Sequence, residues 1–370
     1  MSALRGKCMR KPNIRRVIWE SLALPFAAGT LILALGLEGC TAHPGDAVSI
    51  IAGGDCLLDR YDVSPASGVE AARRWSTLID AANASSAFLF NLETTVGSGG
   101  AAKKKRFVFR APAEALFPLS GFACPVAALA NNHAMDYGPR GLSATIGALD
   151  GLGIAHAGAG RTAVEAAAAT KLALRGETIS VFSFGFDEDR SSYNEGQGEC
   201  IAPLEPIVMK RMIAASVSPS MAIVVMLHWG IEYDRRFNGY QQELARELVR
   251  AGADLVVGTG PHVLQGVEVY RGSLICYSIG NLVFDDLGSD DTTATVIVRM
   301  SLAPGAVRKM RKHFEIAPLR TRNATDGPSR PTASDADHIV ALLSERSPEP
   351  GIFAKRPRLD TSGIEWFSLE

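Results

Sequence analysis

The chain has 370 residues, of which 47% are hydrophobic and 21% are charged, and its formal net charge at pH 7 is −1. This composition is that of a globular protein and excludes an intrinsically disordered chain. A net charge close to zero provides no global field that would attract nucleic acid, so we expect no nucleic-acid partner. The length suits one large α/β domain or two smaller ones.

The first 40 residues have the pattern of an export signal. A basic segment at 1–16 precedes an uncharged apolar run at 21–37, as in the n-region and h-region of a secretory signal. The ending "LEGC" is similar to a bacterial lipobox with Cys40 as the lipid acceptor, although its Glu departs from that pattern. We therefore expect an exported, membrane-attached protein. A cleaved signal and a retained N-terminal anchor stay open, because the run is near the lower limit for crossing a bilayer.

Short apolar segments alternate with helical patterns from residue 46 to residue 302. Strands are expected at 47–53, 87–90, 125–130, 179–185, 221–227, 254–258, 273–280 and 293–302. Helices are expected at 66–82, 140–151, 162–170, 205–216 and 238–251. Continuous apolar strands separated by helices predict sheets that are covered on both faces, so we predict an α/β domain over 46–302.

Beyond Pro304 the chain becomes basic and then rich in Ser and Pro. We interpret this C-terminal extension, 303–370, as a loop followed by a short helix and a tail. Four cysteines remain after the leader, and in an exported protein they are either buried thiols or a disulfide pair that the spacing does not select: Cys56, Cys124, Cys200 and Cys276.

Five polar clusters each follow an apolar segment, at the place where a strand is expected to end. In open α/β sheets, ligands bind outside the carboxyl ends of the strands. The clusters bring carboxylates, amides and imidazoles to this edge: Asp55, Asn91, Glu93, Asn132, His133, His228 and His262. Any one of these side chains also suits a turn or a helix cap. Together they predict one shared polar site.

Carboxylate oxygen, amide oxygen and neutral imidazole nitrogen are ligands that suit Mn²⁺, Fe or Zn²⁺. The predicted ligands are Asp55, Glu93, Asn132, His228 and His262. Within "LANNHAMDYG" at 129–138, Asn132 offers an oxygen to the metal. The next side chain, His133, points the other way and is free for proton transfer, with Asp136 orienting its imidazole.

Six ordered motifs resemble those of the CapA (poly-γ-glutamate capsule synthesis) family, which belongs to the calcineurin-like metallophosphatase superfamily. They are "AGGDCLLDR", "NLETT", "ANNHAMDYG", "HWGIEY", "GADLVVGTGPHVLQGVE" and "YSIGNLVFD", and they cover roughly residues 48–288. The resemblance implies a metallophosphatase-like two-sheet sandwich flanked by helices. It also implies export or membrane attachment and a role in making, anchoring or processing an anionic γ-linked glutamate polymer.

The resemblance also implies roles for single residues. The five predicted ligands and the acid His133 match family positions, and so do Arg60 and Asn281, which we assign to substrate binding together with Arg110. Leu57 stands where metallophosphatases have a His. In the last motif, "TG" at 259–260 replaces two further histidines of many CapA-like chains. With fewer imidazoles, the sequence leaves open whether the site holds one metal ion or none.

Basic residues beside the motifs suit a polyanionic substrate, although such a run is also typical of a solvated loop. They are Lys103, Lys104, Lys105, Arg106, Arg110, Arg235 and Arg236. Two classes of function follow. The chain is either a metal-dependent hydrolase or transferase acting on γ-glutamyl amides or phosphoesters, or a non-catalytic accessory protein. The accessory protein would bind the polymer or synthase subunits at the membrane.

Overall fold

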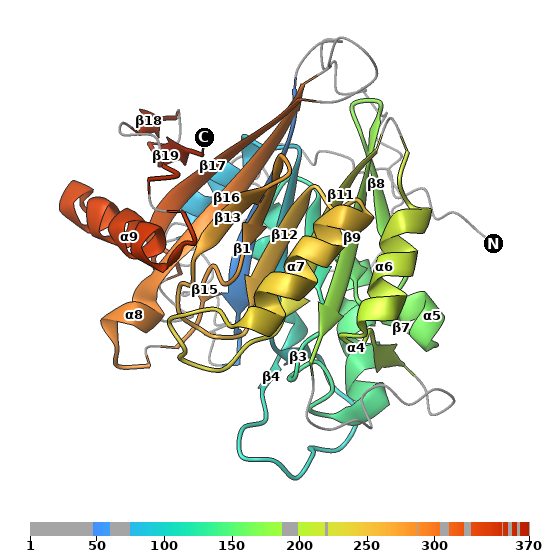
Figure 1. Ribbon diagram of the computed structural model, residues 1–370. Helices are drawn as coiled ribbons and strands as arrows, with labels where there is room; N and C mark the ends of the chain where they lie inside the picture. Colours follow the sequence, from blue (N-terminus) through green and yellow to red (C-terminus); the bar gives the residue numbers. More distant parts are fainter. Residues whose placement is uncertain are drawn as a thin grey trace, which may run out of the picture.

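The computed structural model of the protein is drawn in Figure 1. It describes residues 47–59, 75–186, 199–218, 221–285, 287–303, 311–321, 327–349, 351–353, 357–360 and 363–369. The predicted leader with Cys40 lies outside the described residues, and so does Arg60. Within these described ranges, no helix has the length and apolarity needed to cross a membrane.

The larger sheet of the described chain has nine strands. Its order is β18 (Arg358–Leu359), β19 (Glu365–Ser368), β17 (Arg311–Arg320), β16 (Ala294–Ala303), β1 (Val48–Cys56), β2 (Ala87–Leu92), β5 (Pro125–Ala128) and β6 (Ala155–Ala157), with β15 (Asn281–Val283) also beside β1. Strands β1, β2, β5 and β6 are parallel to one another. Strand β16 is antiparallel to β1, and β17 is antiparallel to β16. The carboxyl ends of β1, β2 and β5 therefore meet at one edge.

The second sheet has six strands: β13 (Val267–Tyr270), β14 (Ser273–Cys276), β12 (Leu255–Thr259), β11 (Met221–His228), β9 (Glu177–Gly185) and β8 (Thr170–Leu174). Its four central strands are parallel and the two edge strands are antiparallel. Two short pairs complete the strands: β3 (Thr95–Val96) with β4 (Arg110–Ala111), and β7 (Ala159–Gly160) with β10 (Cys200–Ile201).

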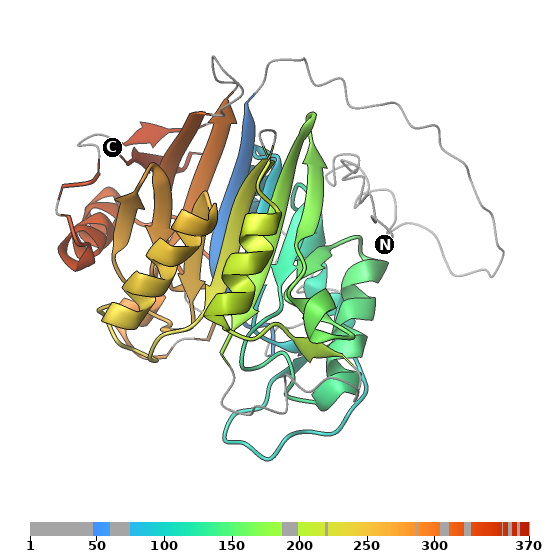
Figure 2. The same cartoon turned by 45° about the vertical axis from the view of Figure 1, so that its right-hand side comes forward.

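The two sheets pack face to face. Alternate residues of each strand point to opposite sides of its sheet, and the apolar side chains on the two inner faces form a core between the sheets. Ile50 of β1 and Val224 of β11 belong to the core between the sheets, whereas Ile51 belongs to the outer core. Helices cover the outer faces (Figures 1 and 2): α6 (Pro206–Ala215) and α7 (Gly239–Ala251) over the six-stranded sheet, and α3 (Ser76–Asn83) and α4 (Gly138–Gly151) beside β2 and β6. This confirms the predicted α/β sandwich flanked by helices.

Each of the eight predicted strands corresponds to a strand of the structure, but the C-terminal extension holds three that were not predicted, β17, β18 and β19. Strand β17 pairs with β16 along ten residues. Its basic start at 311–313 and its Pro318 are untypical of a strand. The register with β16 nevertheless buries Phe314 and Ile316 against the core between the sheets. Helix α9 (Ala333–Arg346) and the one-turn helix α8 (Asp290–Thr293) pack at this side of the molecule.

Candidate functional site

Four of the predicted site residues meet at the carboxyl ends of strands from both sheets. Asp55 ends β1 and Glu93 follows β2, in the nine-stranded sheet. His228 ends β11 and His262 follows β12, in the six-stranded sheet. All four side chains are buried. The site is therefore built across the sandwich, with the carboxylates supplied by one sheet and the imidazoles by the other.

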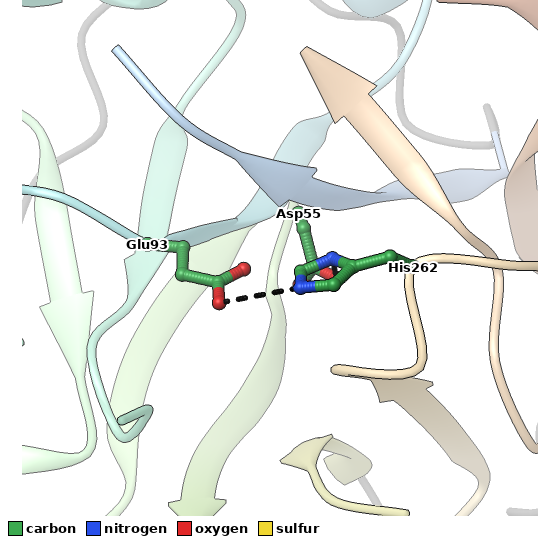
Figure 3. Close-up of side chains that lie close together, drawn as sticks. All are labelled: Asp55, Glu93 and His262. Carbon is green, nitrogen blue, oxygen red and sulfur yellow. Dashed lines mark ion pairs between the residues drawn. The ribbon is translucent and has the colours of Figure 1, made fainter. Parts of the chain in front are cut away.

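Asp55, Glu93 and His262 form the tightest cluster, shown in Figure 3. Each offers one ligand atom, and these three atoms lie within 4.8 Å of one another. His262 Nδ1 lies 3.2 Å from Asp55 Oδ2, and His262 Nε2 lies 3.9 Å from Glu93 Oε1. Bound zinc has ligands at about 2.0–2.2 Å, so three ligand atoms within 4.8 Å of one another need only a small approach to share one ion.

Asn281 fixes the tautomer of His262. The amide nitrogen Nδ2 donates to the carbonyl oxygens of His262 and Thr292, at 3.4 and 3.2 Å. Its oxygen Oδ1 therefore faces His262 Nδ1, 2.9 Å away, and accepts the hydrogen that this nitrogen carries. The second ring nitrogen, Nε2, faces Glu93. Histidines that bind a metal ion commonly donate a hydrogen bond through one ring nitrogen and bind the metal through the other. The contacts of Asn281, which the sequence assigns to substrate binding, hold His262 in place.

The carboxylate of Glu93 is buried, and neither of its oxygens has a hydrogen-bond partner among the described residues. Buried polar groups in folded proteins are almost always hydrogen-bonded, and a buried charge is paired or coordinates a metal. His228 Nε2 lies 3.7 Å from Glu93 Oε1, which is beyond hydrogen-bond distance. The donor set and the unpartnered oxygens of Glu93 thus fit a divalent cation.

The charges of the cluster shift the pKa values of its members in opposite directions. Burial and the charge of Asp55 raise the pKa of Glu93. Burial also opposes ionisation of Asp55, but the imidazoles of His228 and His262 outweigh it and hold the pKa of Asp55 below its usual range. Burial would lower the pKa of His262, yet Glu93 and Asp55 together raise that pKa to about 10. Positive charge is therefore strongly favoured between the two carboxylates.

A chain of amides joins the two sides of the site. The backbone N–H of His133 donates to Asn131 Oδ1 at 3.1 Å, and Asn131 Nδ2 donates to Asn91 Oδ1 at 3.1 Å. Asn91 Nδ2 then donates to Asp55 Oδ1 at 2.7 Å. The N–H at one end and the carboxylate at the other end fix the direction of each amide. Asn131 is not among the predicted site residues, although its place in "NNH" is a usable signal.

Asn91 Nδ2 also lies 3.2 Å from His228 Nδ1, and Thr259 Oγ1 lies 3.2 Å from the same His228 nitrogen. Because the Asn91 nitrogen is a donor, His228 Nδ1 is an acceptor in the neutral ring, which places the ring hydrogen on Nε2 facing Glu93. His228 thus lies beside the cluster, with Nε2 3.7 Å from Glu93 Oε1, and its role as a metal ligand stays a prediction. Thr259 contacts this ring through its hydroxyl group.

Asn132 and His133 lie in the turn after β5. Asn132 Oδ1 is buried and has no hydrogen-bond partner among the described residues, so it retains the acceptor needed for the predicted ligand role. His133 Nδ1 lies 2.9 Å from Asp136 Oδ2, so the predicted orienting hydrogen bond is present. The N–H of Phe109 donates to the same carboxylate oxygen at 2.7 Å, and the Phe109 ring packs on His133 with centroids 4.4 Å apart.

The loop after β12 carries backbone strain. His262 has a φ of 60°, in the left-handed region that costs a non-Gly residue about 1–3 kcal/mol. Gly260 has a φ of 105°, and its N–H donates to Asp55 Oδ2 at 3.0 Å. A side chain at position 260 would be strained in this conformation. Gly260 therefore brings a backbone donor to Asp55.

Arg110, assigned to substrate binding, has structural contacts here. Its guanidinium donates to the carbonyl oxygen of Gly99 and lies 3.3 Å from the centroid of the Tyr137 ring. Arg235, expected at a basic rim, forms an ion pair with Asp291.

Comparison with known proteins agrees with this architecture. A family model described as "Bacterial capsule synthesis protein PGA_cap" matches residues 49–286. The PGA biosynthesis protein CapA of Bacillus subtilis (strain 168) is 33% identical over 219 residues, which are 59% of this chain and 56% of that protein. The capsule biosynthesis protein CapA of Bacillus anthracis is 30% identical over 236 residues, 62% of this chain and 55% of that protein.

A probable polyglutamine synthesis accessory protein of Mycobacterium tuberculosis (strain H37Rv) is 30% identical over 209 residues, which are 53% of this chain and 55% of that protein. The chain thus spans about half the length of the curated relatives it matches. The matched residues 49–286 include both sets of parallel strands and the whole Asp55–Glu93–His262 cluster. The chain therefore belongs to the bacterial capsule synthesis protein PGA_cap family.

Proposed function

We propose that this chain acts in the synthesis, anchoring or processing of a poly-γ-glutamate capsule, and that its Asp55–Glu93–His262 cluster holds a divalent metal ion. One observation carries the metal site: both oxygens of the buried Glu93 carboxylate are without a hydrogen-bond partner in the described part of the chain, beside a second carboxylate and an imidazole. The names of the relatives support the capsule role.

The residues favour Mn²⁺, Fe or Zn²⁺ over a purely oxygen-bound cation, because His262 contributes a nitrogen. Asp55 and Glu93 supply the negative charge, Asn132 offers an amide oxygen, and Asn281 keeps His262 Nε2 turned to the carboxylates. When bound, such an ion polarises a carbonyl or phosphoryl oxygen and lowers the pKa of coordinated water.

His133 is the residue we assign to proton transfer. Its Nδ1 is occupied by Asp136, which leaves Nε2 as the nitrogen that can give or accept a proton. Asp136 is buried and accepts a second hydrogen bond from the Phe109 N–H, so the carboxylate cannot easily turn away from the ring. This fixed His–carboxylate pair is the arrangement required of a general acid, and a protein that only binds a polymer has no need of it.

The substrate class follows from charge and from the relatives. Lys104 and Arg106 are exposed in the basic segment 103–106, and a polymer with one carboxylate per residue would be attracted to them. We propose this anionic polymer, or the synthase subunits that make it, as the partner. We also propose membrane attachment through residues 1–40, with export as the corresponding location.

A second candidate function is a metal-dependent hydrolase of γ-glutamyl amides or phosphoesters unrelated to capsule. The His133–Asp136 pair favours it, since this pair suits hydrolysis of either bond. The two candidates differ in their ligand, because only the first requires affinity for poly-γ-glutamate.

The test compares metal content, polymer binding and hydrolysis across four variants of the full chain. We expect Asn132→Ala and His262→Ala to lose metal, whereas His133→Ala keeps it and loses roughly 10²- to 10⁴-fold in turnover, the range for removal of a general acid. His338→Ala is the matched control, because this imidazole is 52% exposed. A wild-type chain that binds no Mn²⁺, Fe or Zn²⁺ would refute the metal site. Hydrolysis without polymer binding would favour the second candidate.

A further inference from the structure

The side chain of Lys105 contacts the turn of residues 132–136. Its Nζ donates to the carbonyl oxygen of Asn132 at 2.7 Å and forms an ion pair with Asp136 Oδ1. It also lies 3.4 Å from His133 Nδ1. By contrast, the guanidinium of Arg106 lies over the neighbouring Phe107 ring, 5.0 Å from its centroid. Lys105 is thus directed at the turn that carries the proposed proton donor.

The contacts of Asp136 show what Lys105 does there. This carboxylate is fully buried, so its negative charge needs a partner. One oxygen, Oδ2, faces His133 Nδ1 and accepts from the Phe109 N–H. The other oxygen, Oδ1, faces the ammonium group of Lys105. The two oxygens therefore have different partners.

The backbone strengthens this arrangement. The N–H of Lys103 donates to the carbonyl oxygen of Asp136 at 2.8 Å, and the N–H of Phe109 donates to its carboxylate, so the chain is attached to the turn before and after Lys105. The Phe109 ring then covers His133. Residues 103–109 thus form a strap over the turn of residues 132–136, and Lys105 is its charged contact.

We propose that Lys105 is a positioning residue for His133. By pairing with Asp136 Oδ1 and with the Asn132 carbonyl, it keeps Asp136 Oδ2 turned to His133 Nδ1, which holds the hydrogen on Nδ1 and leaves Nε2 for the reaction. This inference rests on the proposed role of His133 as proton donor. It assigns Lys105 to the support of the site, and leaves the anionic substrate to Lys104 and Arg106.

The test reads the tautomer of His133 by ¹⁵N NMR of the full chain, with its signal assigned from a His133→Gln spectrum. In wild type we expect the Nδ1–H form to dominate. Lys105→Met, which keeps the length of the stem and removes the charge, should lose that dominance, and Lys105→Arg should restore at least part of it. Lys104→Met is the matched control, because it removes the same charge from an exposed neighbour and should leave the His133 signals unchanged.

An unchanged His133 tautomer in Lys105→Met would overturn the proposal, and so would an equal change in Lys104→Met. Should Lys105→Met unfold, Lys105→Gln gives the same reading, because its amide can still donate to Asn132 but lacks the charge. Metal content separates this result from the proposed function. All Lys105 variants should bind metal as wild type does, since the Asp55–Glu93–His262 cluster is intact. Loss of metal in wild type would refute the metal site and leave the tautomer result standing.

Discussion

The amides of Asn91 and Asn131 show why this site uses neutral side chains next to its carboxylates. Each amide has a donor on one side and an acceptor on the other, so a chain of them can lead from a backbone N–H to the Asp55 carboxylate without burying further charge. Asn131 Nδ2 also donates to the Leu92 carbonyl oxygen at 2.9 Å. A carboxylate of the same shape at either position would face an acceptor.

Asn131→Asp is therefore expected to destabilise the fold. It places an oxygen where Nδ2 now faces Asn91 Oδ1 and the Leu92 carbonyl, and buries a charge that has no compensating partner. The expected loss is about 3 kcal/mol in the free energy of unfolding, measured by urea denaturation. Asn238→Asp is the matched control, because Asn238 caps α7 by accepting from the Gln241 N–H, a role in which Asp serves as well. Equal stabilities of the two variants would contradict the directed amide chain.

Among the elements, β1 and β15 set the position of Asp55. The strands approach so closely that a Cβ on Gly54 would lie 1.9 Å from the carbonyl oxygen of Gly280. The adjacent Asp55 N–H donates to that same oxygen at 3.1 Å. The register of β1 also shifts between Ala52 and Asp55 relative to β2. Glycine at position 54 thus allows the end of β1 to lie against β15 with Asp55 facing His262.

Gly54→Ala should separate these strands and move Asp55. We expect a loss of about 1–3 kcal/mol in the free energy of unfolding, as for other overpacked sites, together with reduced metal content. Gly147→Ala is the control. A Cβ on Gly147 in α4 would meet no atom within 4 Å, so this change should stabilise the helix by about 0.5–1 kcal/mol. Normal metal binding by Gly54→Ala would show that the contact between β1 and β15 does not position Asp55.

At the scale of the whole molecule, ion pairs tie the C-terminal extension to the site. Arg346 of α9 is buried, forms a 2.7 Å ion pair with Asp291 of α8, and donates to the Leu264 carbonyl oxygen at 2.6 Å. The next residue of α8, Thr292, accepts from Asn281 Nδ2. The extension therefore supports the loop that orients His262.

The Asp291 pair predicts a pH-dependent contribution to stability. Burial opposes ionisation, but Arg346 and Arg235 outweigh it and lower the pKa of Asp291 from its ordinary value of 3.8. A carboxyl whose pKa is lower in the folded state stabilises the protein above its ordinary pKa, and this contribution is lost as the pH falls through the folded-state pKa.

Asp291→Asn should therefore cost about 1–3 kcal/mol at neutral pH, and the difference from wild type should shrink below about pH 4. Urea unfolding at neutral pH and below about pH 4 measures this difference in the free energy of unfolding. Asp150→Asn is the control, since this side chain is 67% exposed and its pairing with His156 should contribute little at either pH. A constant difference for Asp291→Asn across the pH range would exclude the ion pair as its cause.

The leader supplies the last prediction at this scale. If "LEGC" is a lipobox, Cys40→Ser should abolish incorporation of labelled lipid and leave the precursor unprocessed. Labelled palmitate and the electrophoretic mobility of the chain test this in the producing bacterium. Normal processing to a soluble product would refute lipidation at Cys40 and favour an ordinary cleaved signal.

The amino-acid sequence by itself determined the secondary structure that builds the site. Apolar runs produced β1, β2, β5, β9, β11 and β12 where they were expected, because burial on both faces requires continuous apolar segments. Polar residues directly after these runs indicated a site at the carboxyl edge, and ordered motifs indicated the family. Each of these signals is local, so it can be read without knowing which segments lie side by side.

Only the tertiary structure decided how the two sheets face each other, and the chemistry of the site depends on that. The Gly260 N–H reaches Asp55 across 205 residues of chain, and the imidazole of His262 meets a carboxylate from the opposite sheet. The amide chain through Asn131 and the ion pair of Lys105 are likewise contacts between segments that lie apart in the sequence. Residue type shows which bonds a side chain is able to make. Which bonds form depends on distance and direction, and these are set when the sheets pack.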